Sequence, residues 1–128
     1  MRLLLDTHTL IWWVAGHKSL SEKAEKWIAE PADSIFVSAA SAWEMAIKAR
    51  LGRLPSAVDL VSDFDGTLTA EGFQPLLITP DHGIRAGLLP GPHKDPFDRM
   101  LIAQAQAENL IIVSNDTVFD QYGVQRLW

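Results

Sequence analysis

A helix is predicted to begin within the run His93-Lys94-Asp95-Pro96-Phe97-Asp98-Arg99-Met100-Leu101-Ile102-Ala103-Gln104-Ala105-Gln106-Ala107. Asp95 is a favourable N-cap, and Pro96 suits the first turn because its missing N–H would have no partner there. Asp98 then falls at the third helical position. Both carboxylates lie at the positive end of the helix dipole, where we expect them to stay ionised near neutral pH. The apolar positions that recur at helical spacing, and that we expect in the core, are Phe97, Met100, Leu101 and Ala105.

Short apolar runs elsewhere in the chain predict the strands of a sheet. They cover residues 3–5, 34–37, 73–79 and 110–113, with a last edge strand over 124–128. Helical patterns between them follow residue 6 and cover 23–30, 39–51 and 80–88, with a weaker one over 58–70 and a turn or short helix over 117–122. Strands that alternate with helices indicate a three-layer α/β/α domain with a mainly parallel central sheet.

Length and composition indicate one soluble globular domain. The 128 residues suffice for a single domain spanning 1–128, and 48% hydrophobic with 21% charged residues is typical of a globular chain. No apolar run approaches the length of a membrane span, and Asp6 interrupts the apolar N-terminus too early for a signal peptide. We therefore expect a cytoplasmic protein without membrane association.

The charge and the lack of cysteine restrict the possible sites. Without cysteine, any metal must be held by oxygen or imidazole ligands. The net charge of −5 taken alone argues weakly against nucleic acid, because phosphate binders usually carry a basic face. Carboxylates gathered in one cleft around a divalent ion would give the same net charge and would still attract phosphate.

Four acids are predicted to meet at one edge of the sheet. Asp6 and Asp116 each follow a strand, Asp98 opens a helix, and Glu44 lies early on the helix after a strand. Three of the four have a structural alternative. Asp6 can simply cap the next helix, and Asp98, together with Asp95, can belong to an ordinary capping arrangement. Glu44, beside the stripe of Trp43 and other apolar residues, would usually face solvent.

Grouped carboxylates repel one another and become protonated unless a cation lies between them. Hard oxygen ligands favour Mg²⁺ or Mn²⁺, and such an ion promotes hydrolysis of a phosphodiester. No Walker loop, nucleophile elbow or glycine-rich dinucleotide turn supports another chemistry. His82 and His93 have no partner histidine at ligand spacing, so helix-end or loop roles are favoured for them.

Two other functions remain open at this point. The run Asp63-Phe64-Asp65-Gly66-Thr67-Leu68 matches the motif of haloacid-dehalogenase-type phosphatases, with Asp63 as nucleophile and Asp65 as general acid. That motif needs a buried strand before it and a long domain after it, and this chain offers neither, so the phosphatase is the runner-up. The third possibility is a non-catalytic binding module whose acids hold an ion or a partner's arginines.

The sequence resembles a PIN-domain ribonuclease of the VapC toxin type over nearly its whole length, in the runs Leu4-Leu5-Asp6-Thr7-His8, Ser38-Ala39-Ala40-Ser41-Ala42-Trp43-Glu44, His93 to Ala105 and Ser114-Asn115-Asp116. The resemblance implies that the acidic site consists of Asp6, Glu44, Asp98 and Asp116. It further implies Asp6 and Asp98 as ligands of Mg²⁺ or Mn²⁺, and supporting roles for Asp95, Ser114 and Thr7.

The same resemblance implies a toxin of a type II toxin–antitoxin pair. Such a protein would cut RNA, form a homodimer, and be inhibited by a small VapB-like antitoxin bound over the active cleft. Lys94 and Arg99 flank the expected site and are candidates for substrate contact, although Arg99 is equally placed to pair with a neighbouring acid. The motifs are silent over residues 56–72.

Overall fold

In a computed structural model of this chain, which describes residues 1–128, five parallel strands form the central sheet. They run in the spatial order β3-β2-β1-β4-β5. The strands are β1 (Arg2–Leu5), β2 (Ser34–Ser38), β3 (Gln74–Leu76), β4 (Ile111–Val113) and β5 (Arg126–Leu127). Because all five are parallel, their carboxyl ends meet at one edge of the sheet, as the alternation of strands and helices predicted.

Strand β1 occupies the centre of the sheet and contributes to both faces. Its register places Leu4 between Phe36 of β2 and Ile112 of β4. Successive side chains of a strand point to opposite faces, so Leu3 and Leu5 belong to one hydrophobic core and Leu4 to the other. All three leucines are fully buried.

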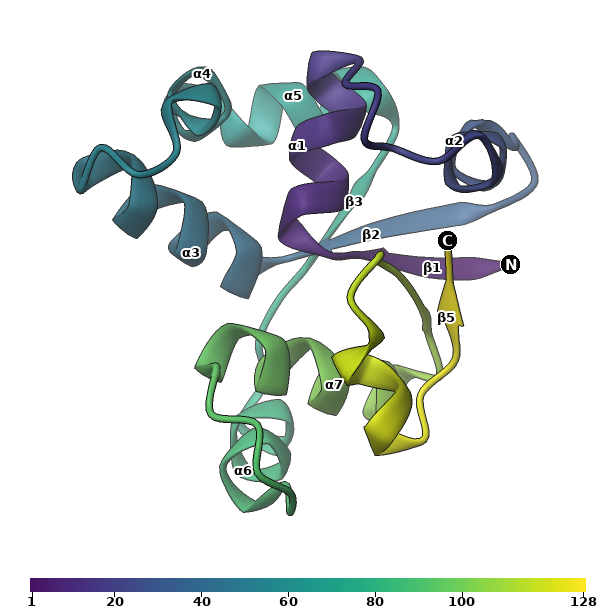
Figure 1. Cartoon of the computed structure of the whole chain (residues 1–128), viewed down its shortest axis with the longest axis vertical. Helices are drawn as coiled ribbons and strands as arrows, with labels where there is room; N and C mark the ends of the chain where they lie inside the picture. The colour runs from purple at the N-terminus through teal and green to yellow at the C-terminus, as the bar shows by residue number, and fades with distance from the viewer.

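One core lies beneath the helices of the first half of the chain (Figure 1). These elements are α1 (Thr7–Ala15), α2 (Glu22–Ala29), α3 (Ala39–Arg50), the 3₁₀ turn η1 (Pro55–Ala57), α4 (Val58–Ser62) and α5 (Phe64–Glu71). Leu10, Ile28 and Met45 bring α1, α2 and α3 into this core. Helix α2 buries Ala24 and Ile28, and Trp27 packs partly buried against the same core.

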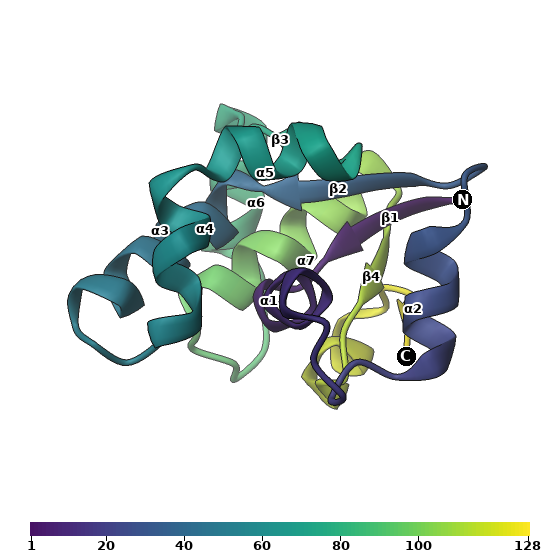
Figure 2. The ribbon, with the colours of Figure 1, turned by 90° about the horizontal axis from the view of Figure 1, so that it is seen from above.

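The opposite face of the sheet is covered by α6 (Pro80–Leu88), α7 (Pro96–Glu108) and the 3₁₀ helix η2 (Thr117–Tyr122), as Figures 1 and 2 show. Leu101 and Ile102 of α7 pack there with Phe119 of η2. Of the four predicted core positions of α7, Leu101 and Ala105 are buried, whereas Phe97 and Met100 are half-buried. The predicted three-layer α/β/α architecture is confirmed. None of the helices has the length and apolar character that crossing a bilayer requires.

Helix α3 is rotated relative to the expectation from its sequence. Trp43 is 58% exposed, whereas the adjacent Glu44 is only 6% exposed. The apolar stripe around Trp43 therefore lies on the outer surface, and the polar face of Ser41 and Glu44 is buried. A buried carboxylate is costly unless it is paired, and the contacts that pair Glu44 belong to the site described below.

The weak helical pattern over residues 58–70 is split in two. Helix α4 ends at Ser62, and α5 begins at Phe64. The phosphatase-like run therefore begins between two short helices rather than after a buried strand. Asp63 and Asp65 are both exposed. This geometry lacks the strand on which a phosphatase nucleophile is carried, so the runner-up function loses its structural support.

Candidate active site

Asp6 joins the end of β1 to the start of α1 and has both roles that its position allowed. Its Oδ1 accepts the Thr7 N–H at 2.8 Å, which caps α1. Its Oδ2 accepts a hydrogen bond from the Ser114 hydroxyl at 2.7 Å, at the end of β4. Burial raises the pKa of Asp6 above its usual value, while the bonds from Ser114 and Thr7 act in the opposite direction.

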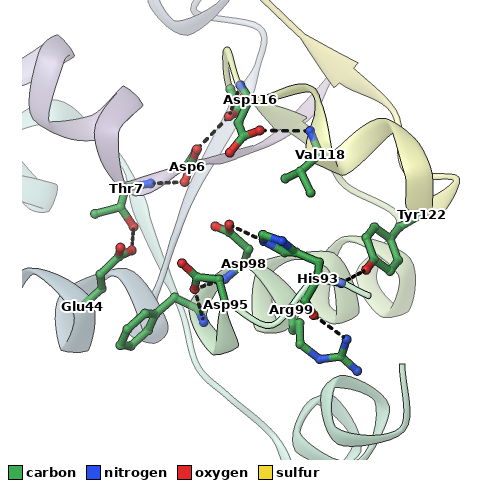
Figure 3. Close-up of polar contacts among 12 residues, drawn as sticks. Asp6, Thr7, Glu44, His93, Asp95, Asp98, Arg99, Asp116, Val118 and Tyr122 are labelled. Atoms are coloured by element: carbon green, nitrogen blue, oxygen red, sulfur yellow. Dashed lines mark hydrogen bonds and ion pairs between the residues drawn. The ribbon is translucent and has the colours of Figure 1, made fainter. Parts of the chain in front are cut away.

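Asp98 faces this strand edge from the first turn of α7. Asp95 caps the helix, and its Oδ1 accepts the N–H groups of Phe97 and Asp98 at 2.9 and 3.2 Å. Asp98 Oδ2 lies 2.8 Å from His93 Nε2, and Asp98 Oδ1 accepts no hydrogen bond from the protein (Figure 3).

Burial raises the pKa of Asp98 to about 6, and the nearby charges of Asp6 and Asp95 add to the shift. The helix dipole alone predicted a readily ionised carboxyl at this position. The shift runs the other way because loss of solvation exceeds what the dipole and His93 contribute. With a pKa of about 6, Asp98 loses its proton about one pH unit below neutrality.

Glu44 is buried at the same edge and is held through both carboxylate oxygens. Oε1 accepts a hydrogen bond from Thr7 Oγ1 at 2.7 Å, and Oε2 pairs with Lys48 Nζ at 2.6 Å, one helical turn further on. Ser41 Oγ lies 2.9 Å from the same Thr7 hydroxyl. The charge of Glu44 contributes to the raised pKa of Asp6, which places these two acids within electrostatic reach of each other.

Asp116 is the outermost of the four acids. It is exposed, and its Oδ1 accepts the Val118 N–H at 3.0 Å, which caps η2. Its backbone N–H donates to Ser114 Oγ at 3.0 Å, so Ser114 links Asp116 to Asp6. The structure thus brings Asp6, Glu44 and Asp98 into a partly buried cluster and places Asp116 on its rim.

The two flanking cations differ in their environment. Arg99 donates from Nη1 to the His93 carbonyl at 3.0 Å and from Nη2 to the Leu89 carbonyl, and Figure 3 shows its guanidinium pointing away from the acids. Arg99 therefore holds the loop before α7. Lys94 is exposed and its ammonium makes no hydrogen bond within the protein, so it remains available to a ligand.

Sequence reasoning did not identify three polar side chains of this region. Ser41 precedes Glu44 by three residues, and that helical spacing was the available signal for a shared face. Lys48 follows Glu44 by four residues, which suits an ion pair, but its place in the last turn of α3 equally suits an interaction with the helix dipole. The Tyr122 hydroxyl accepts the His93 N–H at 3.2 Å across 29 residues, a contact with no local signal.

The donors fit a hard divalent cation, although they do not form a closed cage. All available ligands are carboxylate oxygens, and Asp98 Oδ1 is unpartnered. No three His, Asp or Glu side chains converge into a ready-made metal site. Mg²⁺ commonly uses one or two protein carboxylates and completes its shell with water and phosphate, so an incomplete protein shell of this type suits it.

Comparisons with known proteins found similar proteins over nearly the whole chain. The PIN-domain profile matches residues 3–125. Ribonuclease VapC22 from Mycobacterium tuberculosis (strain ATCC 25618 / H37Rv) is 34% identical over 115 residues, which cover 89% of this chain and 86% of that protein. Among solved structures, VapBC2 from Rickettsia felis, bound to a promoter DNA fragment, superposes with a TM-score of 0.72 at 16% identity, covering 100% of this chain and 99% of that one.

A second solved structure, the sarcin–ricin loop cleaving toxin VapC20 of Mycobacterium tuberculosis, superposes with a TM-score of 0.68 at 15% identity and covers 95% of each chain. At these identities the two superpositions show a shared fold. The family profile and the 34% identical relative carry the assignment beyond the fold.

Proposed function

Because this chain belongs to the PIN-domain family and has a VapC-type ribonuclease among its relatives, we propose that it is a metal-dependent endoribonuclease toxin of a type II, VapBC-like pair. The observation that carries the proposal is the pairing of Asp6 and Asp98 across the carboxyl edge of the sheet. Each carboxyl has a raised pKa, and the charge of Asp6 contributes to the shift of Asp98. A carboxylate that raises the pKa of its neighbour in this way favours a cation between the two.

Asp6 and Asp98 would hold the ion, and the surrounding residues fix their orientation. Ser114 and Thr7 hold the two oxygens of Asp6, and Asp95 caps the helix that carries Asp98. An Mg²⁺ or Mn²⁺ ion held by these two carboxylates would supply Lewis-acid chemistry for hydrolysis of the phosphodiester. Glu44 is paired with Lys48 in this structure, so its role is to tune the pKa of Asp6 or to orient water.

RNA would approach over the exposed side of the acidic cluster. Lys94 lies beside Asp95 and presents an unpaired ammonium for a phosphate. A groove of about 360 Å³ adjoins it, with Trp43 and Phe97 in its walls, and aromatic side chains of this kind can stack on an unpaired base. With a net charge of −5, RNA binding would rest on these local contacts and weaken strongly with salt.

We extend the proposal to the partners of this chain. Structural neighbours include VapBC complexes, which supports a VapB-like antitoxin that covers the acidic edge and inhibits cleavage. Exposed apolar side chains on and beside α3 and α6, among them Trp43, Ile84 and Leu88, support a homodimer. The functional unit would be the single PIN domain of residues 1–128, acting on RNA in the cytoplasm.

The test is cleavage of total cellular RNA by the purified, antitoxin-free protein in Mg²⁺ or Mn²⁺. Discrete fragments are expected from the wild type, none with EDTA, and none from Asp98→Asn. Asp63→Asn is the matched control, because it removes an exposed aspartate away from the site and should leave cleavage unchanged. Intact RNA with folded, metal-loaded wild type would favour the binding-module alternative. If the wild type hydrolyses a phosphomonoester and Asp63→Asn does not, the phosphatase function would be favoured instead.

The partner proposals have separate measurements. Light scattering should give twice the chain mass for the isolated protein, and Ile84→Glu should shift that mass towards one chain without unfolding it. Addition of the purified cognate antitoxin should suppress RNA cleavage at a stoichiometric ratio. A monomeric wild type, or cleavage that persists with saturating antitoxin, would contradict the respective proposal.

A further inference from the structure

The loop between α6 and α7 delivers a histidine directly to the acidic cluster. His93 Nε2 lies 2.8 Å from Asp98 Oδ2, and both side chains are partly buried, with 24% and 17% of their surfaces exposed. In Figure 3 the His93 ring reaches from the loop towards Asp98, which lies between His93 and Asp6. The sequence favours a helix-end or loop role for His93, and the structure shows that the carboxylate it contacts is Asp98.

The loop is held from two independent elements. Arg99 of α7 donates to the backbone carbonyls of His93 and Leu89, so the loop is fastened at both of its ends. The hydroxyl of Tyr122, at the end of η2, accepts the His93 N–H at 3.2 Å. A histidine whose backbone is fixed on both sides has little freedom to leave its hydrogen bond.

Gly91 shows how closely this loop approaches Tyr122. Its φ of +101° lies in the region that favours glycine, and a Cβ at this position would come within 2.7 Å of the Tyr122 hydroxyl oxygen. A side chain at position 91 would therefore displace the tyrosine that holds His93. The packing of Gly91, Tyr122 and Arg99 together fixes the histidine relative to the sheet.

We propose that His93 is a positioning residue for Asp98, and that Arg99 and Tyr122 act through it. With Asp98 ionised, Oδ2 can only accept, so the Nε2–H of His93 donates to it. This bond fixes the otherwise broad rotation of the carboxylate plane and leaves Oδ1 open to the cluster. Hydrogen bonds of this kind orient a carboxylate ligand and change its affinity for metal. The proposal rests on the proposed function in that it takes Asp98 as a metal ligand.

The contact with Asp98 also allows a positioning role of His93 to be distinguished from direct binding of the metal. The Nε2 atom is occupied by Asp98, and a direct ligand could not be replaced by an amide donor with the same effect. Glutamine can present an N–H at a similar distance from the backbone, whereas alanine cannot. His93→Gln and His93→Ala therefore distinguish a hydrogen-bond donor from a metal ligand.

The experiment measures Mn²⁺ binding by the intact, RNA-free protein, with free Mn²⁺ quantified by electron paramagnetic resonance at constant pH. The variants are His93→Ala, His93→Gln and Tyr122→Phe. His17→Gln is the matched control, since this histidine lies at the end of α1, away from the acids. Thermal unfolding of each metal-free variant verifies that it is folded.

We expect about 10-fold weaker Mn²⁺ binding in His93→Ala, the lower end of the range for residues that orient a ligand. His93→Gln should recover most of the affinity, and His17→Gln should match the wild type. Tyr122→Phe should weaken binding in the same direction by a smaller factor. In RNA cleavage at saturating metal, His93→Ala should lower kcat while KM stays close to that of the wild type.

Three results would overturn the positioning role. The first is wild-type Mn²⁺ affinity in His93→Ala, and the second is an affinity in His93→Gln as weak as in His93→Ala. The third is a wild type that binds no Mn²⁺. If binding depends on His93 as expected but no RNA is cut, positioning stands and the ribonuclease proposal fails. If instead RNA is cut but Mn²⁺ binding does not depend on His93, the ribonuclease proposal stands and the positioning role fails.

Discussion

Replacing Asp98 by asparagine should stabilise the metal-free protein. The pKa of Asp98 rises from 3.8 to about 6 on folding, so the folded state binds this proton more tightly than the unfolded state. For an acid shifted in this direction, the contribution to stability is greatest below pH 4 and is lost as pH rises towards 6. Above that range the ionised carboxylate opposes folding until a cation binds.

The size of the effect follows from the shift. About two pKa units correspond to about 3 kcal/mol at full strength. The side chain is 17% exposed, so solvent screening reduces this value, and we expect about 1–2 kcal/mol. Asparagine has nearly the same shape and still accepts the His93 hydrogen bond, but it carries no charge. The substitution should therefore remove the cost without opening a cavity.

Urea unfolding in EDTA at pH 7.5 and pH 4.5 provides the assay, with Asp63→Asn as the exposed control. Asp98→Asn should raise the unfolding free energy by about 1–2 kcal/mol at pH 7.5 and by clearly less at pH 4.5, because the wild-type carboxyl is then protonated. An equal gain at both pH values would show that charge is not the cause. A less stable variant at pH 7.5 would refute the burial argument itself.

Three further outcomes are expected from the same cluster. Mg²⁺ should raise the thermal midpoint of the wild type more at pH 7.5 than at pH 5.5, because protons compete with the ion for Asp98. The midpoint of Asp98→Asn should not change with Mg²⁺. A shift of the wild type that does not depend on pH would count against this site. Lys48→Met leaves the buried Glu44 without its ion pair and should lower the unfolding free energy by about 1–2 kcal/mol, so unchanged urea unfolding would show that the pair contributes nothing. Ser114→Ala removes a hydrogen bond that lowers the pKa of Asp6, so the acidic limb of RNA cleavage should move to higher pH, and an unmoved limb would contradict the assignment.

Much of the fold could be predicted because its boundaries carry local signals. Asp6, Ser38 and Asp95 each cap a helix through the side chain, as their positions before helical patterns suggested. The orientation of α3 could not be obtained in this way. Its apolar residues favour burial of Trp43, but the structure buries Glu44 instead. Glu44 is stabilised there by its hydrogen bonds with Thr7 and Lys48, and Thr7 lies 37 residues away in the sequence.

The same distinction separates the predicted and the unpredicted parts of the site. That acids would gather at the carboxyl edge follows from strand topology, and the structure brings Asp6, Glu44 and Asp98 together there. The direction of the Asp98 pKa shift depends on burial, which spacing cannot supply. The sequence allows Arg99 either a substrate contact or a pairing with an acid, and the structure shows bonds to loop carbonyls that only the folded loop presents to it.

The anchoring of the acids explains why the site is incomplete by itself. Within the cluster of Asp6, Glu44 and Asp98, Glu44 is held through both oxygens and Asp6 accepts one bond at each oxygen, whereas Asp98 keeps one oxygen without a partner. Such a cluster is rigid, but it offers an ion few ready ligands, in agreement with the lack of a three-residue metal group. On the proposed function, water and the RNA phosphate would supply the remaining ligands. Metal and RNA would then strengthen each other's binding, and an antitoxin over this edge would exclude both.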